Sequence, residues 1–187
     1  MKNITKILVL VALLLPAASF AQISFLVGAN GGLTTPTADL ATDFNSGYNI
    51  GAEAELQLAG NDFFADLVYN SMTAKNTVLN TKNLNITEVS VGYRRDLFNL
   101  GALAGGSAVF IDAGAGLYST SEYFKSNGGF IATPSASNFG VNGGIGASFH
   151  FTPKAKFIGR FKYHNIIDAA NGNKTYFTIS AGVNFGL

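Results

Sequence analysis

Alternation of apolar residues with small or polar residues runs through most of this chain after Gln22. Between Asn138 and Phe151, one set of alternate residues is almost entirely apolar, whereas the other set holds Asn, Gly, Ser and His. The same pattern recurs in Tyr48–Leu58 and in Thr175–Leu187. A period of two places successive side chains on opposite sides of an extended strand. The chain is therefore predicted to form β-strands whose two faces meet different surroundings.

Eight segments carry this alternation, and each has about the length that a tilted membrane-spanning strand needs. They are Ile23–Asn30, Tyr48–Leu58, Phe63–Met72, Leu84–Arg94, Ser107–Ser119, Asn138–Phe151, Lys156–Tyr163 and Thr175–Leu187. Leu84 and Ile86 are out of phase with the rest of their strand, which predicts a β-bulge there. The long connection Thr120–Ser137 has room for a short hairpin, so ten strands is the alternative to eight.

The composition of the two faces distinguishes a membrane barrel from a soluble one. A soluble sandwich or lipocalin-like barrel also alternates, but its polar face is rich in charge. Here only 12% of residues are charged, and the polar face consists mostly of Gly, Ser, Asn and Thr. The apolar face carries aromatic residues towards the strand ends, namely Phe139, Phe149, Tyr48, Tyr69 and Tyr93. This arrangement is typical of a lipid-facing band with aromatic girdles around a narrow, polar interior.

The connections between the predicted strands alternate between long and short. Gly31–Gly47 and Thr120–Ser137 are long, whereas Ala59–Asp62 and Thr152–Ala155 are tight. If both ends of the chain lie in the periplasm, the long loops all fall on the outer side, as in outer-membrane barrels. The predicted fold is therefore all-β, an eight-stranded antiparallel up-and-down transmembrane β-barrel.

The first 21 residues have the features of a secretory signal peptide. Lys2 and Lys6 precede the apolar run Ile7–Leu15, and the small-residue stretch Ala17–Ala21 follows. The run is too short to cross a membrane as a helix. We expect cleavage after Ala21, leaving residues 22–187 as an outer-membrane barrel in a diderm bacterium.

The signal peptide, the alternating strands and the closing segment Tyr176–Leu187 together resemble the OmpA-like outer-membrane β-barrel superfamily, and in particular its small eight-stranded members. The resemblance covers the whole chain after residue 21. It implies that the closing strand is read by the barrel-assembly machinery, although the family usually ends in Phe and this chain ends in Leu187, with Phe185 two residues earlier. It also implies contact with outer-membrane lipids.

Charged residues are predicted to gather on the inward face. They are Glu53, Glu55, Asp66, Glu88, Arg94, Asp112, Arg160 and Lys162. His150, close to the turn at Thr152 and Pro153, is a further candidate, as an interior or a rim residue. An eight-stranded barrel has an interior just wide enough for side chains to fill it, so these charges must pair. Two interpretations follow: an ion pathway or gate, and a salt-bridged plug that fixes the strand register. The plug is favoured.

The long loops are the predicted places of partner contact. Phe44 lies in the first, and Tyr123, Phe124 and Phe130 lie in the loop after the fifth strand. Aromatic residues in exposed loops are candidates for binding. The alternative is that these side chains fold back over the barrel mouth or lie among the lipid headgroups.

Catalytic and cofactor chemistry finds little support in the sequence. Some outer-membrane barrels trim lipid A with a His and a Ser two residues apart, but His164 is followed by Asn165 and Ile166. A histidine without a nucleophile does not make a hydrolase. The chain has no cysteine and only two histidines, so neither a metal site nor a cofactor is predicted. A net charge of +1 gives no reason to expect a nucleic-acid partner.

Three functional hypotheses follow. The first is a structural or interaction scaffold of the outer membrane that displays surface loops. The alternative is a small, porin-like channel that passes ions or small solutes. A lipid-modifying barrel enzyme is the least favoured, and the prediction is that the protein is not an enzyme.

Overall fold

The strands pair antiparallel throughout, and the sheet that they form closes on itself. The computed structural model describes residues 23–58, 61–75, 81–100, 106–126, 129–132, 136–152, 154–168 and 172–187. The predicted signal peptide lies outside the described residues. The strands are β1 (Ile23–Pro36), β2 (Gly47–Leu58), β3 (Asn61–Thr73), β4 (Thr81–Asn99), β5 (Ala108–Ser126), β6 (Gly129–Ala132), β7 (Ala136–Thr152), β8 (Ala155–Ile167) and β9 (Lys174–Gly186).

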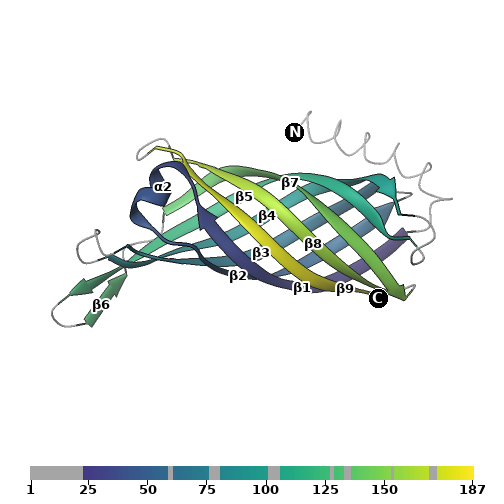
Figure 1. The fold of residues 1–187 in the computed structure, drawn as a ribbon, viewed down its shortest axis with the longest axis horizontal. Helices are drawn as coiled ribbons and strands as arrows, with labels where there is room; N and C mark the ends of the chain where they lie inside the picture. Colours follow the sequence, from purple (N-terminus) through teal and green to yellow (C-terminus); the bar gives the residue numbers. More distant parts are fainter. Residues whose placement is uncertain are drawn as a thin grey trace, which may run out of the picture.

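Closure of the sheet leaves eight strands in the barrel. β1 pairs with both β2 and β9, and β4 pairs with both β3 and β5. Within the described residues, β6 pairs only with β5, and together they form a hairpin that projects from one end (Figure 1). The predicted eight-stranded antiparallel barrel is confirmed. The connection Thr120–Ser137 does contain a hairpin, but the hairpin lies outside the closed sheet, so the ten-stranded alternative is wrong.

The two ends of the barrel differ. β1 begins and β9 ends at one end, here called the inner end, where Leu26 pairs with Gly186. The opposite end, here called the outer end, carries the β5–β6 hairpin and the short helix α2 (Ala38–Asp43) (Figure 1). Among the described residues, no helix is long and apolar enough to cross a membrane.

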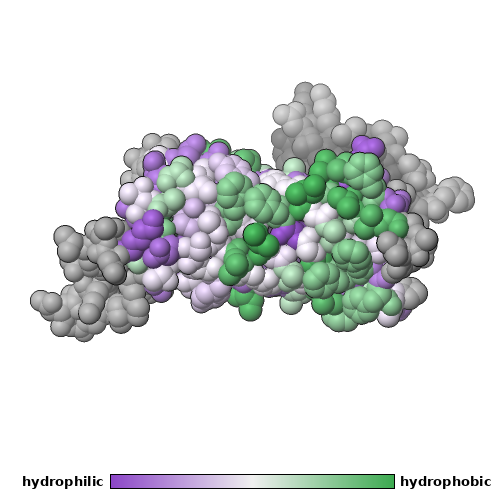
Figure 2. Space-filling model, viewed as in Figure 1, coloured by the Kyte–Doolittle hydropathy of each residue, from purple (hydrophilic) through white to green (hydrophobic). Residues whose placement is uncertain are grey.

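Alternation places apolar side chains outside and polar side chains inside, as the sequence predicted. Along β3, inward residues are buried and outward residues are exposed in strict alternation from Asn61 to Asn70. The exposed residues include many large apolar side chains, such as Leu67, Val91 and Ile179. Figure 2 shows that they form an apolar band over the inner part of the barrel, with a paler zone towards the outer end. A surface of this kind suits lipid at the band and water beyond it.

The outer ends of the strands extend further than the alternation predicted. β1 continues to Pro36 rather than Asn30, and β5 continues to Ser126 rather than Ser119. In the β1 extension, Gly31 and Thr35 interrupt the outward apolar series on either side of the exposed Leu33, and in β5 Ser121 interrupts it. The alternation that marks a lipid-facing strand is therefore weaker there, although the backbone hydrogen bonds between the strands continue.

The predicted bulge at Leu84 and Ile86 is wrong. The pairing of β4 with β5 is continuous from Asn83 to Asp96, and its irregularities fall instead between Thr81 and Asn83 and between Asp96 and Phe98. Leu84 and Ile86 are both fully buried on the inside of the barrel. The apolar residues change phase because the two faces of the strand exchange polarity. Above the apolar band, the inside of the barrel is apolar and the outside is polar.

Candidate functional site

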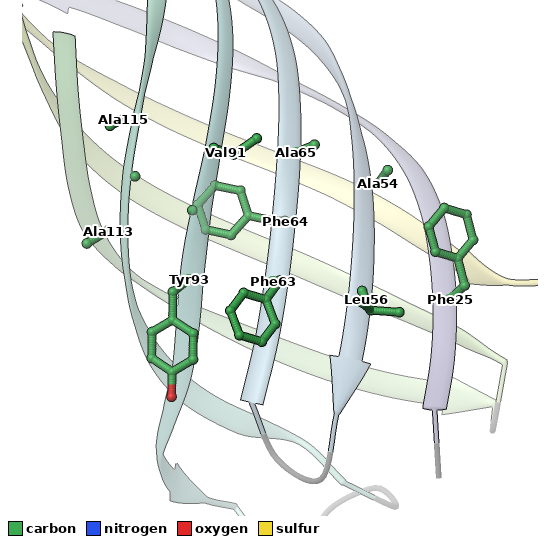
Figure 3. A pocket seen from close by; sticks show the side chains of 12 residues that line it. Phe25, Ala54, Leu56, Phe63, Phe64, Ala65, Val91, Tyr93, Ala113 and Ala115 are labelled. Atoms are coloured by element: carbon green, nitrogen blue, oxygen red, sulfur yellow. The ribbon is translucent and has the colours of Figure 1, made fainter. Parts of the chain in front are cut away.

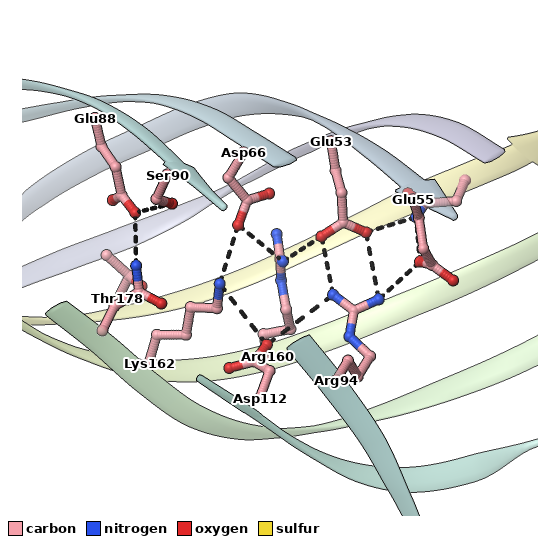
Figure 4. Close-up of polar contacts among 12 residues, drawn as sticks. Glu53, Glu55, Asp66, Glu88, Ser90, Arg94, Asp112, Arg160, Lys162 and Thr178 are labelled. Carbon is pink, nitrogen blue, oxygen red and sulfur yellow. Dashed lines mark hydrogen bonds and ion pairs between the residues drawn. The ribbon is translucent and has the colours of Figure 1, made fainter. Parts of the chain in front are cut away.

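The inside of the barrel, the lumen, collects the charged side chains that the sequence placed there. All eight predicted lumen residues are buried: Glu53, Glu55, Asp66, Glu88, Arg94, Asp112, Arg160 and Lys162. They come from β2, β3, β4, β5 and β8, and ion pairs connect most of them (Figure 4). Ion pairs thus join strands that the hydrogen-bonded ladder does not connect, such as β8 with β2 and β3.

Arg94 is the centre of the inner part of this network. Its guanidinium donates to Glu55 Oε2 at 2.7 Å and to Glu53 Oε2 at 2.9 Å. The same group lies 4.6 Å from the ring centroid of Phe110 and 5.3 Å from that of Phe64. Two carboxylates and two aromatic faces therefore surround one buried cation. These contacts offset the free-energy cost of removing the guanidinium from water.

Two further cations complete the middle of the network. Arg160 pairs with Glu53 and lies 3.4 Å from Asp66, whereas Lys162 donates to the same Asp66 oxygen at 3.0 Å. Lys162 also lies 3.7 Å from Asp112. Each cation therefore contacts carboxylates on two strands, so removal of one side chain leaves more than one partner uncompensated.

A second polar cluster lies closer to the outer end. Glu88 accepts hydrogen bonds from Ser90 at 2.7 Å and from Asn142 at 3.0 Å. His164 Nδ1 lies 3.3 Å from Glu88, and its Nε2 lies 3.1 Å from the Thr178 hydroxyl. The imidazole thus contacts a carboxylate through one nitrogen and a hydroxyl through the other, as in a hydrolytic triad, but all three groups are buried inside the barrel.

Above this cluster, apolar side chains close the outer mouth. Leu40 of α2 and Phe44 fold inward and pack with residues from the barrel wall. This apolar plug consists of Leu40, Phe44, Met72, Leu84, Ile86, Tyr118, Ile166 and Tyr176. The His164 ring stacks on Tyr176 at a centroid distance of 4.5 Å, which joins the polar cluster to the plug.

Backbone bonds hold the plug segment in place. Thr37 N–H donates to Thr175 O, Asn45 N–H donates to Thr73 O, and Lys75 N–H donates to Asp43 O. The segment from Thr37 to Asn45 is thereby fastened to β9 on one side and to β3 on the other.

Little space is left between these groups. A cavity bordered by Asp66, Glu88, Arg160 and Thr178 has a volume of about 10 Å³. That is room for about one water molecule. Inward glycines allow the close filling, because the Phe64 ring lies over Gly92, the Phe110 ring over Gly146 and the Tyr118 ring over Gly140.

Comparison with known proteins decides the family. Residues 7–185 match the family model of the outer membrane protein beta-barrel domain. The chain belongs to this family. It is an outer-membrane β-barrel, and the resemblance to small eight-stranded outer-membrane proteins is confirmed. No curated protein sequence matches it.

Solved structures share the fold at low sequence identity. Neisserial surface protein A is 17% identical, with a TM-score of 0.62, and the match covers 88% of this chain and 98% of that one. A major outer membrane protein from Thermus thermophilus is 11% identical, with a TM-score of 0.55, covering 89% and 100%. The N-terminal β-barrel domain of Pseudomonas aeruginosa OprF is 16% identical, with a TM-score of 0.50, covering 89% and 99%. At these identities the likeness shows the fold alone.

Hollows larger than the lumen cavity lie on the outward face of this outer-membrane barrel. One groove, of about 740 Å³, crosses β1 to β5 (Figure 3). Phe25, Phe63 and Tyr93 form one wall, and Ala54 and Ala65 form part of the floor. The groove lies within the apolar band, at the level of lipid.

The predicted loop contacts have different outcomes. Phe44 is only 6% exposed, because it packs into the apolar plug. Its assignment as a surface contact is therefore wrong. The alternative prediction, that the side chain folds back over the barrel mouth, describes its position. The backbones of Tyr123, Phe124 and Phe130 lie in the β5–β6 hairpin. Their side chains lie outside the described part of the structure.

Sequence reasoning missed Lys156 and His164 as lumen residues. Lys156 pairs with Glu55 and lies 3.9 Å from Asp62, and the next two residues in phase, Ile158 and Arg160, point inward. Extending the inward phase of β8 at both ends would have found the two residues. His150 lies at the inner rim, one of its two predicted positions, where Nδ1 is 2.8 Å from the Gly106 carbonyl oxygen.

Proposed function

We propose that this outer-membrane barrel is a closed, membrane-anchored scaffold whose outer loops contact partners. The observation that carries the proposal is the filled lumen, in which the cavity beside Asp66 and Glu88 has room for about one water molecule. A barrel with this interior offers little volume for a solute. Its outer end, by contrast, presents a projecting hairpin.

The two parts of the lumen oppose conduction in different ways. In the inner part, Arg94 and Lys156 are held by carboxylates and lie across the path. In the outer part, the core of the apolar plug is formed by aliphatic and aromatic side chains. Apolar constrictions exclude water, and ions do not pass where water is excluded.

The loops that remain for contact are those beyond the plug. The β5–β6 hairpin holds Tyr123, Phe124 and Phe130, and its backbone extends past the barrel wall (Figure 1). A rigid barrel limits the conformational freedom of the loops that it carries, which favours specific binding. The closing strand β9 is in turn the expected contact for the barrel-assembly machinery.

The test is a planar-bilayer recording with residues 22–187 refolded into lipid. A silent bilayer is expected, with folding shown by the heat-dependent gel shift of an intact barrel and with a general porin as control for detection. Steady unit conductance from the folded protein would overturn the proposal.

A small channel is the second candidate, and the polar column between Asp62 and Glu88 favours it. If ions follow this column, replacing Glu53 and Arg160 together by Ala must change conductance or selectivity, because the two side chains pair inside it. An unchanged current in the double variant excludes these residues as the pathway.

A lipid-modifying enzyme has the least support. His164 faces the lumen and is 3% exposed, so its imidazole does not meet membrane lipid. We expect no turnover of labelled lipid A by the parent protein. Turnover that His164→Ala abolishes would reverse this assignment.

A further inference from the structure

A belt of hydroxyl side chains lies on the outward face just above the apolar band. Its members, here called the hydroxyl collar, are Thr73, Thr87, Ser119, Ser121 and Ser137. Thr87 pairs with Ser119 and Ser119 pairs with Ser137, so three neighbouring strands present hydroxyls side by side.

The position of the collar is fixed by the residues below it. Tyr48, Tyr69 and Tyr163 are exposed at the outer edge of the apolar band. Exposed tyrosines of this kind mark the boundary between hydrocarbon and headgroups. Tyr69 pairs directly with Thr87, so the collar begins where the hydrocarbon ends.

The collar is uncharged. Its five members are Thr and Ser, and none of them is Asp, Glu, Lys or Arg. Phosphate groups are recognised by Arg and Lys, which the collar lacks. A hydroxyl group both donates and accepts hydrogen bonds, which is what the hydroxyls of a neutral sugar require.

The geometry of the sheet adds a second match. Neighbouring strands lie about 4.8 Å apart, so the hydroxyls of Thr87, Ser119 and Ser137 form a regular row around the barrel. The exposed tyrosine rings below offer apolar faces on which the C–H face of a sugar ring can rest. Donors, acceptors and apolar faces thus occur together at headgroup level.

We propose that the hydroxyl collar binds the saccharide headgroups of glycolipids in the outer leaflet, through neutral sugars rather than phosphates. This proposal is independent of whether the lumen conducts. It predicts that the barrel is stabilised by a neutral glycolipid and that the effect is insensitive to salt, since no ion pair contributes.

The experiment compares unfolding of the barrel in phosphatidylethanolamine vesicles with and without digalactosyl diacylglycerol, a neutral glycolipid. The wild type is expected to unfold at a higher urea concentration with the galactolipid, at low and at high salt alike. The variant Thr87→Val/Ser119→Ala/Ser137→Ala removes three hydroxyls and is expected to lose the shift. Thr152→Val, which removes an exposed hydroxyl at the inner end, is the matched control and should keep it.

Three outcomes overturn the proposal: no shift in the wild type, an equal shift in the triple variant, or a shift only with the anionic lipid phosphatidylglycerol. If the triple variant does not fold, a measurement on the wild type replaces it. In mixed micelles with the galactolipid, NMR magnetisation transfer from galactose protons to Thr87 and Ser119 is expected. Absence of this transfer contradicts the collar as the binding surface.

Discussion

Arg94 of β4 and Glu55 of β2 pair across the lumen at 2.7 Å, although β3 separates their strands in the sheet. The hydrogen-bonded ladder does not join β2 to β4, so this contact supplies a link that the backbone lacks. Both side chains are almost completely buried. The pair therefore constrains the cross-section of the barrel.

Removing the charge of Arg94 is expected to destabilise the barrel strongly. Arg94→Met leaves Glu53 and Glu55 buried without their shared cation, and breaking a buried pair costs about 3–5 kcal/mol. Urea unfolding in lipid vesicles measures the effect. Arg95→Met is the matched control, because the neighbouring side chain points outward and is exposed, so a change within about 0.5 kcal/mol is expected. Equal losses in the two variants would contradict a special role of the lumen pair.

Glycine at position 146 is expected to be needed for space. A Cβ at Gly146 would lie 2.4 Å from the Phe110 ring and 2.5 Å from the Gly159 carbonyl oxygen. Overpacking of this kind costs about 1–3 kcal/mol, so Gly146→Ala should lower the free energy of unfolding by that amount. Gly159→Ala on the adjacent strand is the control, because nothing lies within 4 Å of its Cβ position. A Gly159→Ala variant that loses as much stability as Gly146→Ala would show that the effect is not steric.

Phe44 is expected to hold the plug segment closed. Truncation of a buried Phe to Ala typically costs about 3–5 kcal/mol, and here the loss falls on a short segment held by few backbone bonds. Phe44→Ala should therefore increase protease cleavage within residues 37–46 of the membrane-embedded protein. Asp43→Ala, an exposed neighbour, should leave the cleavage rate near that of the wild type. Unchanged cleavage in Phe44→Ala would show that the hydrogen bonds alone retain the plug.

The alternation predicted the barrel because every strand within the membrane has one face toward lipid and the other toward the lumen. Glu53 and Glu55 were assigned to the lumen by their phase alone, and both lie there. The partners of each charge did not follow from the sequence, since contacts such as Lys156 with Glu55 join strands that the ladder does not connect.

The outer end was harder to predict for a physical reason. Ile86 and Leu84 keep the backbone register but reverse the usual polarity of inside and outside, so the pattern resembled a bulge. Phe44 lies in a loop by sequence, but its side chain belongs to the interior because the segment that carries α2 turns it into the mouth. Neither feature is encoded in a local period of two.

The reversal of polarity along β4 makes a last prediction about the membrane boundary. Val91 and Thr87 both point outward and are exposed, but Val91 lies within the apolar band and Thr87 lies above it. An Arg on the lipid face costs about 2–4 kcal/mol near the middle of the bilayer and about 0–1 kcal/mol near its edges. Val91→Arg should therefore reduce the free energy of unfolding in vesicles far more than Thr87→Arg, whereas in detergent micelles the two should differ less. If Thr87→Arg is as costly as Val91→Arg in bilayers, the hydrocarbon reaches above Thr87, and the boundary drawn at Tyr69 is wrong.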